Sequence, residues 1–167
     1  ANALGGGARA PESAPTARLL AGVCFRLCRS EVDAAFRFAE IALFAVDAAQ
    51  RAQGLGTGLM ARLRALAAAP GWRLGAVFAY ADHSAFGFFR KVGFSRTITT
   101  RREHWRSAIA EYDSATMVEC VPGAELAAAL PDRCTSGLPN CHCKTGRARA
   151  VLRIGGASGS EVLEEYC

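Results

Sequence analysis

The sequence predicts an α/β (α+β) fold in which a mixed central sheet is flanked by helices. Strand-like and helix-like segments alternate along residues 19–121, which is typical of a sheet with both parallel and antiparallel strands. Two long apolar strands open this range as a hairpin, and a glycine-rich turn leads into an amphipathic helix. The 167 residues are 51% hydrophobic and 21% charged, so the chain is long and apolar enough to bury one core.

The first half of this range is predicted to be a hairpin followed by a helix. Leu19–Leu27 is a strand, a polar bend follows through Arg29–Asp33, and Ala35–Val46 is a longer strand that pairs with the first. The helix ends at Pro70-Gly71. Its apolar face is predicted from residues at helical spacing: Leu55, Leu59, Met60, Leu63 and Leu66.

The second half continues the alternation of strands and helices. Leu74–Tyr80 is a buried strand, and Asp82 or Ser84 caps a helix that runs to Lys91 and ends at Gly93. The remaining elements are a strand over Phe94–Thr99, a short helix over Glu103–Tyr112 and a closing strand over Ala115–Val121.

The two ends of the chain lack clear periodicity. Residues 1–18 are rich in Ala, Gly and Pro, and we expect a disordered or truncated leader; residues 122–167 are expected to form an irregular tail. Cys134, Cys141, His142 and Cys143 lie in this tail, but their spacing is not the usual one for zinc ligands. We therefore expect free thiols and no bound metal.

Net charge excludes some partners and favours others. The net charge is +5, and the basic excess lies before Val121, which suits an anionic cofactor. The basic residues are too dispersed to predict direct nucleic-acid binding. No apolar stretch reaches the roughly 20 residues that cross a bilayer, and no signal peptide is present at the start, so no membrane partner is expected.

One carboxylate, Glu40, lies at the centre of the apolar run Phe36–Val46. Burial of a charged carboxylate costs free energy unless the group is paired, protonated or used in chemistry. Spacing alone favours a glutamate that faces a partner arginine or solvent over a catalytic one. By two-residue alternation, Phe38 and Ala42 share its face of the strand.

The segment Arg51–Thr57 places glycines directly before a helix, where unpaired amides and the helix dipole favour anions. It lacks the glycine spacing of the dinucleotide fingerprint, and no Gly-Lys-Ser/Thr follows as in a nucleotide triphosphatase loop. Taken alone, the turn is equally well explained as a structural turn or as a phosphate site.

Arg51-Ala52-Gln53-Gly54-Leu55-Gly56 resembles the pyrophosphate-binding motif, [Arg or Gln]-x-x-Gly-x-[Gly or Ala], of the GNAT acetyltransferase superfamily. Further matches follow in one family's order, and they lie at residues 38–41, 80–82, 85–94, Tyr112 and 116–120. The stretch from Leu19 to Val121 thus resembles a PCAF-like, general-control-type histone acetyltransferase domain. That family has a strand and helices ahead of the residue matching Leu19, so the resemblance implies an amino-terminally truncated GNAT fold.

The resemblance implies transfer of an acetyl group from acetyl-CoA to a lysine side chain of histone tails, by direct attack in a ternary complex. Glu40 is the implied general base, and no metal is required. The implied acetyl-CoA contacts are Phe44, Ala45, Val46, Arg51, Ala52, Gln53, Gly54, Gly56, Thr57, Ala85, Phe88, Phe89 and Lys91. The implied acceptor-site residues are Tyr80, Asp82 and Tyr112, although Asp82 is equally well explained as a helix cap and Tyr80 as a core aromatic.

Two departures from the family concern the thioester. The family usually has cysteine where Phe44 stands, and it has a tyrosine where Phe88 stands. One alternative to a histone acetyltransferase is a GNAT enzyme that acetylates a small amine or a non-histone protein. Another is a catalytically weak CoA-binding module, which the two departures make credible. The implied partners are histone tails and coactivator-complex subunits, and the implied location is the nucleus, with the cytoplasm as the alternative.

Overall fold

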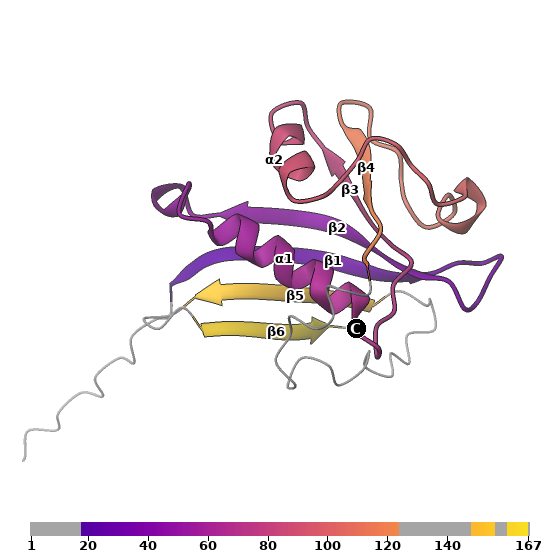
Figure 1. Ribbon diagram of the computed structural model, residues 1–167, viewed down its shortest axis with the longest axis horizontal. Helices are drawn as coiled ribbons and strands as arrows, with labels where there is room; N and C mark the ends of the chain where they lie inside the picture. Colours follow the sequence, from indigo (N-terminus) through magenta and orange to yellow (C-terminus); the bar gives the residue numbers. More distant parts are fainter. Residues whose placement is uncertain (1–17, 124–147, 156–159, 167) are drawn as a thin grey trace, which may run out of the picture.

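The computed structural model describes residues 18–123, 148–155 and 160–166, and its strands form one sheet in the order β4-β3-β2-β1-β5-β6 (Figure 1). β2 and β3 are parallel, and the other neighbouring pairs are antiparallel, so the predicted mixed sheet is confirmed. The strands are β1 (Leu19–Arg29), β2 (Arg37–Val46), β3 (Ala76–Ala81), β4 (Thr116–Cys120), β5 (Ala148–Gly155) and β6 (Ser160–Tyr166). The helices are α1 (Leu55–Ala68) and α2 (Phe86–Lys91), with 3-10 turns at Ala48–Gln50 and Arg102–His104.

The β1–β2 hairpin contains a bulge at Ala42. Cys24 pairs with Leu43 but its neighbour Phe25 pairs with Ile41, so Ala42 is the extra residue of β2. An extra residue reverses the alternation of side chains along a strand. Ala39 and Ile41 therefore pack in the core beneath α1, and beyond the bulge it is Phe44 and Val46 that pack against that core.

β2 and β3 separate beyond the bulge. Their parallel pairing runs from Phe38↔Ala76 to Ile41↔Ala79, whereas β2 continues to Val46 and β3 to Ala81. β1 still pairs with this last part of β2, and β4 with the last part of β3. The two central strands thus open into a wedge on the side where α1 and α2 begin.

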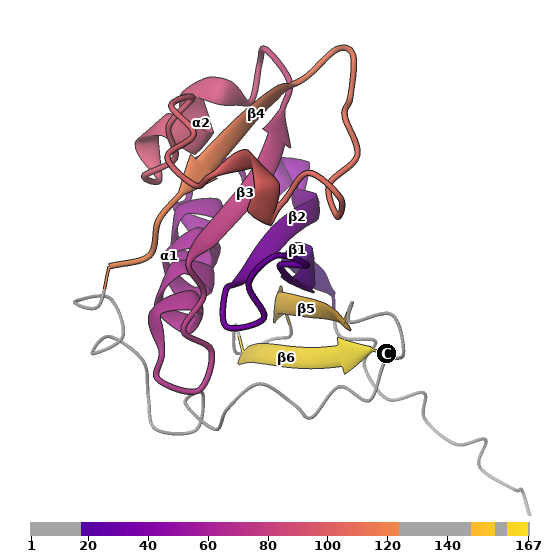
Figure 2. The same cartoon turned by 90° about the vertical axis from the view of Figure 1, so that its right-hand side faces the viewer.

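α1 packs along one face of the sheet (Figure 2). Its buried residues match the predicted apolar face: Leu59, Met60, Leu63 and Leu66 are each at most 2% exposed. Trp72, beyond the end of the helix, is buried with its ring 6.1 Å from that of Phe25. Burial of such side chains contributes about 1.5–3 kcal/mol each, so the packing of α1 on the sheet accounts for much of the free energy of folding.

The opposite face of the sheet is covered by the segment that links α2 to β4. Trp105 and Ile109 of this segment pack on Phe38 and Phe78. One row of cross-strand neighbours on this face contains three charged residues and one aromatic: Arg26 of β1, Glu40 of β2, Phe78 of β3 and Glu119 of β4 lie side by side. The sheet therefore separates an apolar core from a second face that carries buried charge.

Two predicted elements in the linking segment were wrong. Instead of a strand over Phe94–Thr99, only Ser95 pairs with β4, by a single bridge to Glu119. The carboxylate of Glu119 accepts hydrogen bonds from the backbone N–H groups of Thr99 and Thr100 and from the Thr99 hydroxyl. A side chain thus satisfies the donors that a strand would have given to a ladder.

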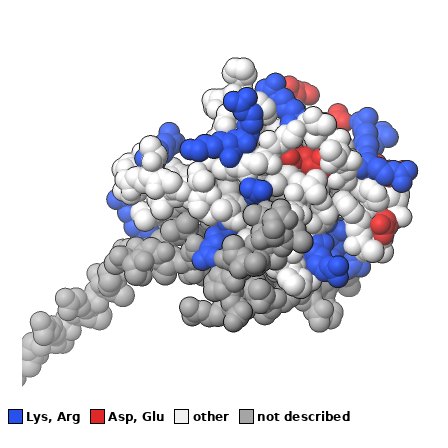
Figure 3. Space-filling view, in the orientation of Figure 1, with Lys and Arg blue, Asp and Glu red and all other residues white. Residues whose placement is uncertain are grey.

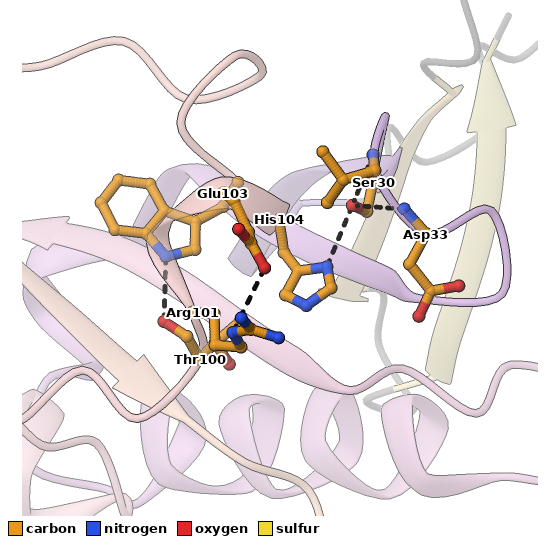
Figure 4. Close-up of polar contacts among 8 residues, drawn as sticks. Ser30, Asp33, Thr100, Arg101, Glu103 and His104 are labelled. Atoms are coloured by element: carbon orange, nitrogen blue, oxygen red, sulfur yellow. Dashed lines mark hydrogen bonds and ion pairs between the residues drawn. The ribbon is translucent and has the colours of Figure 1, made fainter.

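The predicted helix over Glu103–Tyr112 is reduced to the 3-10 turn and the turns after it. Trp105 and Ile109 have helical spacing, but tertiary contacts fix this segment. The Trp105 indole N–H donates to the Thr100 carbonyl at 3.3 Å, and His104 Nδ1 lies 3.0 Å from the Ser30 hydroxyl in the hairpin loop (Figure 4). The contact between Ser30 and His104 joins two loops that are 74 residues apart in sequence. Ser30 also accepts a hydrogen bond from the N–H of Asp33, which holds its hydroxyl in place.

The expectation of an irregular tail was wrong for β5 and β6. β5 pairs antiparallel with the outer edge of β1, from Leu19↔Gly155 to Leu27↔Ala148, and β6 pairs with β5. An open strand edge leaves unpaired N–H and C=O groups, and this hairpin satisfies those of β1. Residues 124–147, which include the cysteines and histidine at 134–143, lie outside the described residues. Of the leader expected at residues 1–18, only Arg18 is described.

Two surface properties bear on possible partners. Among the described residues, no helix combines the length and hydropathy needed to cross a bilayer. On the face shown in Figure 3, basic side chains stand in several separate groups rather than in one stripe.

Replacement of Glu119 by alanine tests the role of the buried carboxylate. Three donors would lose their acceptor, so we expect a loss of about 3 kcal/mol in the free energy of unfolding, measured by denaturant titration. Glu103→Ala is the matched control, because that side chain is 49% exposed and should change stability by no more than about 0.5 kcal/mol. Equal stabilities of the two variants would contradict the assigned role.

Candidate active site

A cavity of about 790 Å³ fills the wedge between β2 and β3. Its walls are the last part of β2, the turn and first residues of α1, the end of β3 and the helix α2. Of the predicted acetyl-CoA contacts, those that line it are Phe44, Ala45, Val46, Arg51, Ala52, Gly54, Gly56, Thr57, Ala85, Phe88, Phe89 and Lys91. Residues distant in sequence thus share one concave surface, which is how small-molecule sites are typically built.

The glycine turn at one end of the cavity has the backbone that an anion site needs. Gly54 has φ +84°, a left-handed conformation that glycine adopts without steric cost, and its carbonyl accepts the N–H of Gly58 at 2.8 Å. The first amides of a helix have no intrahelical acceptor and carry the positive end of its dipole. Gly54, Leu55, Gly56 and Thr57 line the cavity, so the helix N-terminus at this end has the backbone that can bind an anion.

An aromatic stack crosses the cavity from β2 to α2. The rings of Phe44 and Phe88 lie 5.0 Å apart at an interplanar angle of 21°. Gly56 lies directly beneath them, because a Cβ there would be 3.2 Å from Phe44 Cζ and from Val46 Cγ2. The absence of a side chain at Gly56 thus lets α1 approach these rings closely, and a Cβ there would have to displace Phe44 and Val46.

Glu40 directly precedes the cavity-lining Ile41 on β2 and forms an ion pair, although it does not line the cavity itself. Its side chain is 4% exposed, and it faces the sheet surface opposite α1, where the Arg26 guanidinium donates to Oε2. Burial lowers the pKa of Arg26, but the hydrogen bond and charge of Glu40 outweigh it and raise that pKa. The expectation that Ala42 shares the face of Glu40 was wrong, because Ala42 is the bulge residue and is exposed.

Tyr80 connects Glu40's face of the sheet to the cavity. It lines the cavity, and its ring meets that of Tyr112 edge-on at 4.8 Å between centroids. Burial raises the pKa of Tyr80, and the nearby charges of Glu111 and Glu40 add to that shift. The phenol therefore stays protonated and is a hydrogen-bond donor at neutral pH.

Asp82 caps the turn before α2. Its Oδ1 accepts hydrogen bonds from the Ser84 hydroxyl and the Ala85 N–H, each at 2.7 Å, and these bonds lower the pKa of Asp82. The predicted cap is thus only partly right, because Asp82 caps the turn that ends at Ala85, whereas α2 itself begins after Ala85 with no side-chain cap. Asp82 also lines the cavity.

Three predicted site residues do not line the cavity: Glu40, Gln53 and Tyr112. Sequence reasoning missed several that do, namely Ile41, Ala42, Leu43, Gln50, Leu55, Ala79 and Ser84. The missed residues on β2 and β3 line the cavity because the two strands separate there, and the residue types in a strand do not predict where it separates from its neighbour. It also missed Arg26, whose pairing with Glu40 depends on the hairpin register.

Comparison with known proteins of similar sequence and fold identifies the protein family. Residues 15–94 match the family model described as the acetyltransferase (GNAT) family. The chain therefore carries a domain of the GNAT acetyltransferase family, with the GNAT fold.

Within that family, the chain is similar in sequence and structure to GCN5 proteins. The chain is 33% identical over 136 residues to histone acetyltransferase GCN5 of Oryza sativa subsp. japonica, covering 74% of this chain and 25% of that protein. It is 33% identical over 84 residues to histone acetyltransferase GCN5 of Yarrowia lipolytica, covering 50% of this chain and 18% of that protein. The crystal structure of Tetrahymena GCN5 superimposes with a TM-score of 0.55 at 32% identity, covering 64% of this chain and 62% of that one. The chain thus spans a quarter or less of these two curated relatives.

Gly56→Ala tests whether the cavity is the cofactor site. The added methyl group would push into Phe44 and Val46, so we expect coenzyme A to bind at least ~10-fold more weakly by calorimetry, a loss of about 1.4 kcal/mol.

Gly58→Ala on the same helix is the matched control. A Cβ at this position meets nothing within 4 Å, so coenzyme A affinity should stay within about twofold while helix propensity improves. Equal affinities for both variants would place the coenzyme elsewhere.

Proposed function

We propose that this chain transfers the acetyl group of acetyl-CoA to the side-chain amine of lysine in histone tails. One observation carries the proposal: a buried carboxylate, Glu40, directly precedes Ile41, where β2 begins to line a cavity that has a glycine turn and a helix N-terminus at its end. The arrangement supplies a base, a site for the donor and an open wall for the acceptor. The GCN5 relatives support histones as the acceptor class.

Residues of the cavity fit the parts of acetyl-CoA. The pyrophosphate would bind the amides of Gly54, Gly56 and Thr57, with Arg51, Ala52 and Gln53 beside it. The pantetheine arm would pass between β2 and α2, along the backbone of Ala45 and Val46 and the side chains of Ala85, Phe89 and Lys91. The thioester would then lie near the Phe44–Phe88 stack, next to Glu40.

The reaction requires a base because a lysine ammonium has a pKa of about 10.4 and cannot attack while protonated. Glu40 takes this proton, directly or through one water, and the free amine attacks the thioester carbonyl. The backbone N–H of Phe44 donates to the oxyanion that forms. The tetrahedral intermediate then releases coenzyme A as a thiolate, and its nitrogen loses its second proton as the amide forms. Water carries that proton to the thiolate, because Phe88 has no hydroxyl to do so.

The acceptor side is formed by Tyr80, Asp82 and Tyr112. The two tyrosine rings form an aromatic wall, and the protonated phenol of Tyr80 can donate to a peptide carbonyl. A nuclear location and a place among coactivator-complex subunits follow from the histone substrate as part of the same proposal.

A second candidate function rests on the aromatic stack. Phe44 and Phe88 fill the space near the expected thioester and supply no polar group. A chain of this kind can bind coenzyme A yet transfer slowly, and so act as a binding module. Coenzyme A binding with no transfer to any peptide or polyamine would favour this alternative.

Glu40→Gln tests the proposed base. The amide keeps the size of the side chain and an acceptor for Arg26, so folding and coenzyme A affinity should change little. Transfer to a histone-tail peptide at neutral pH should fall by a factor of about 10²–10⁴, the usual contribution of a general base. Product formation followed by mass spectrometry measures it.

Controls separate the base from the choice of acceptor. Glu31→Gln changes an exposed glutamate and should leave the rate unchanged. Free polyamines assayed in parallel should be poorer acceptors than the peptide; the reverse order would indicate a small-amine acetyltransferase. Unchanged transfer in Glu40→Gln would refute the catalytic role.

A further inference from the structure

Arg26 is a charged residue at the candidate site to which the motifs and the proposed reaction assign no role. It lies directly opposite Glu40 on the neighbouring strand β1, and its guanidinium is the cation in contact with the carboxylate. The arginine side chain is 23% exposed, whereas the glutamate side chain is 4% exposed. Arg26 thus lies between Glu40 and the protein surface.

The guanidinium is held from a second direction. The nitrogen that contacts Glu40, Nη2, also lies 3.4 Å from the carbonyl oxygen of Ala108, in the segment between α2 and β4. Ile109 beside it is buried against Phe38 and Phe78, which anchors this segment to the sheet. Both the strand register and the packed segment therefore fix where the positive charge stands.

Other ionisable groups lie near the pair on each element that packs against it. They are Cys28 on β1, Tyr80 on β3 and Arg102, Glu111 and Tyr112 on the linking segment. Glu119 on β4 is hydrogen-bonded to Thr99 and Thr100. Arg102 is 62% exposed and pairs with Glu111, so its charge is screened by solvent.

We propose that Arg26 is the positioning residue of the general base: it keeps the buried Glu40 carboxylate ionised and fixes its orientation. The proposal rests on the proposed function for its catalytic meaning, but the ion pair can be tested without turnover. A buried carboxylate without a cation partner takes up a proton instead of staying charged. A protonated glutamate cannot accept a proton from lysine, so the cation is needed for the base to be ready.

The positive charge of Arg26 also favours the deprotonation of Glu40 after the reaction. When Glu40 accepts the lysine proton it becomes neutral, and Arg26 then lies beside an uncharged group. Release of that proton to water restores the ion pair, so the arginine favours the reset. The guanidinium itself neither gains nor loses a proton in this cycle.

Carbon-13 NMR of the Glu40 side-chain carboxyl, followed through a pH titration, tests the proposal directly. Arg26→Met keeps the length of the stem and removes the charge, so the midpoint of the carboxyl titration should move to higher pH by ~1–3 units. The acidic limb of kcat/KM for the lysine peptide should move with it. Arg26→Lys restores a charge and should recover most of the shift.

Controls keep the test decisive. Arg102→Met removes an exposed charge nearby and should move the midpoint by less than about 0.3 units. If Arg26→Met does not fold, Arg26→Gln keeps a donor without the charge and gives the same comparison. A midpoint that stays at the wild-type pH in the folded variant would overturn the proposal. Absence of transfer in the wild type, with the shift present, would overturn only the proposed function.

Discussion

The bulge at Ala42 is the constraint on which the site depends. One extra residue in β2 ends the pairing with β3 and reverses the direction of the side chains that follow. Before the bulge, Glu40 faces the covered polar side of the sheet; after it, Phe44 and Val46 face α1 and the cavity. A regular strand would close the wedge and turn the aromatic ring away from it.

The two faces of the sheet have different physical roles. The face under α1 is apolar, and its burial supplies the main driving force for folding. The other face carries Glu40 and Glu119, whose desolvation must be offset by Arg26 and by the donors of Thr99 and Thr100. The segment that covers this face has little regular structure because its polar groups are committed to these contacts. Buried charge is thereby kept beside the cavity at a tolerable cost.

The sequence alone was sufficient where local pattern decides structure. Apolar spacing predicted the hairpin and α1, and the glycine motif predicted the turn that holds Gly54 in a left-handed conformation. It was insufficient where distant residues decide. After Phe94, the Glu119 carboxylate accepts the backbone N–H groups of Thr99 and Thr100, and the edge of β1 pairs with β5, which is more than a hundred residues away in sequence. For Glu40, spacing favoured a partner arginine or solvent over catalysis, but the identification of Arg26 as the partner required the register across the bulge.

We propose that the wedge between β2 and β3 holds the acyl donor beside the ion pair of Glu40 and Arg26. A crystal structure of the chain soaked with acetyl-CoA is the decisive measurement. We expect pyrophosphate oxygens on the amides of Gly54 and Gly56 and the thioester between β2 and α2, with Arg26 still on Glu40. Coenzyme ordered on another surface, or a wedge closed by the Phe44–Phe88 stack with no ligand in it, would contradict this placement of the donor.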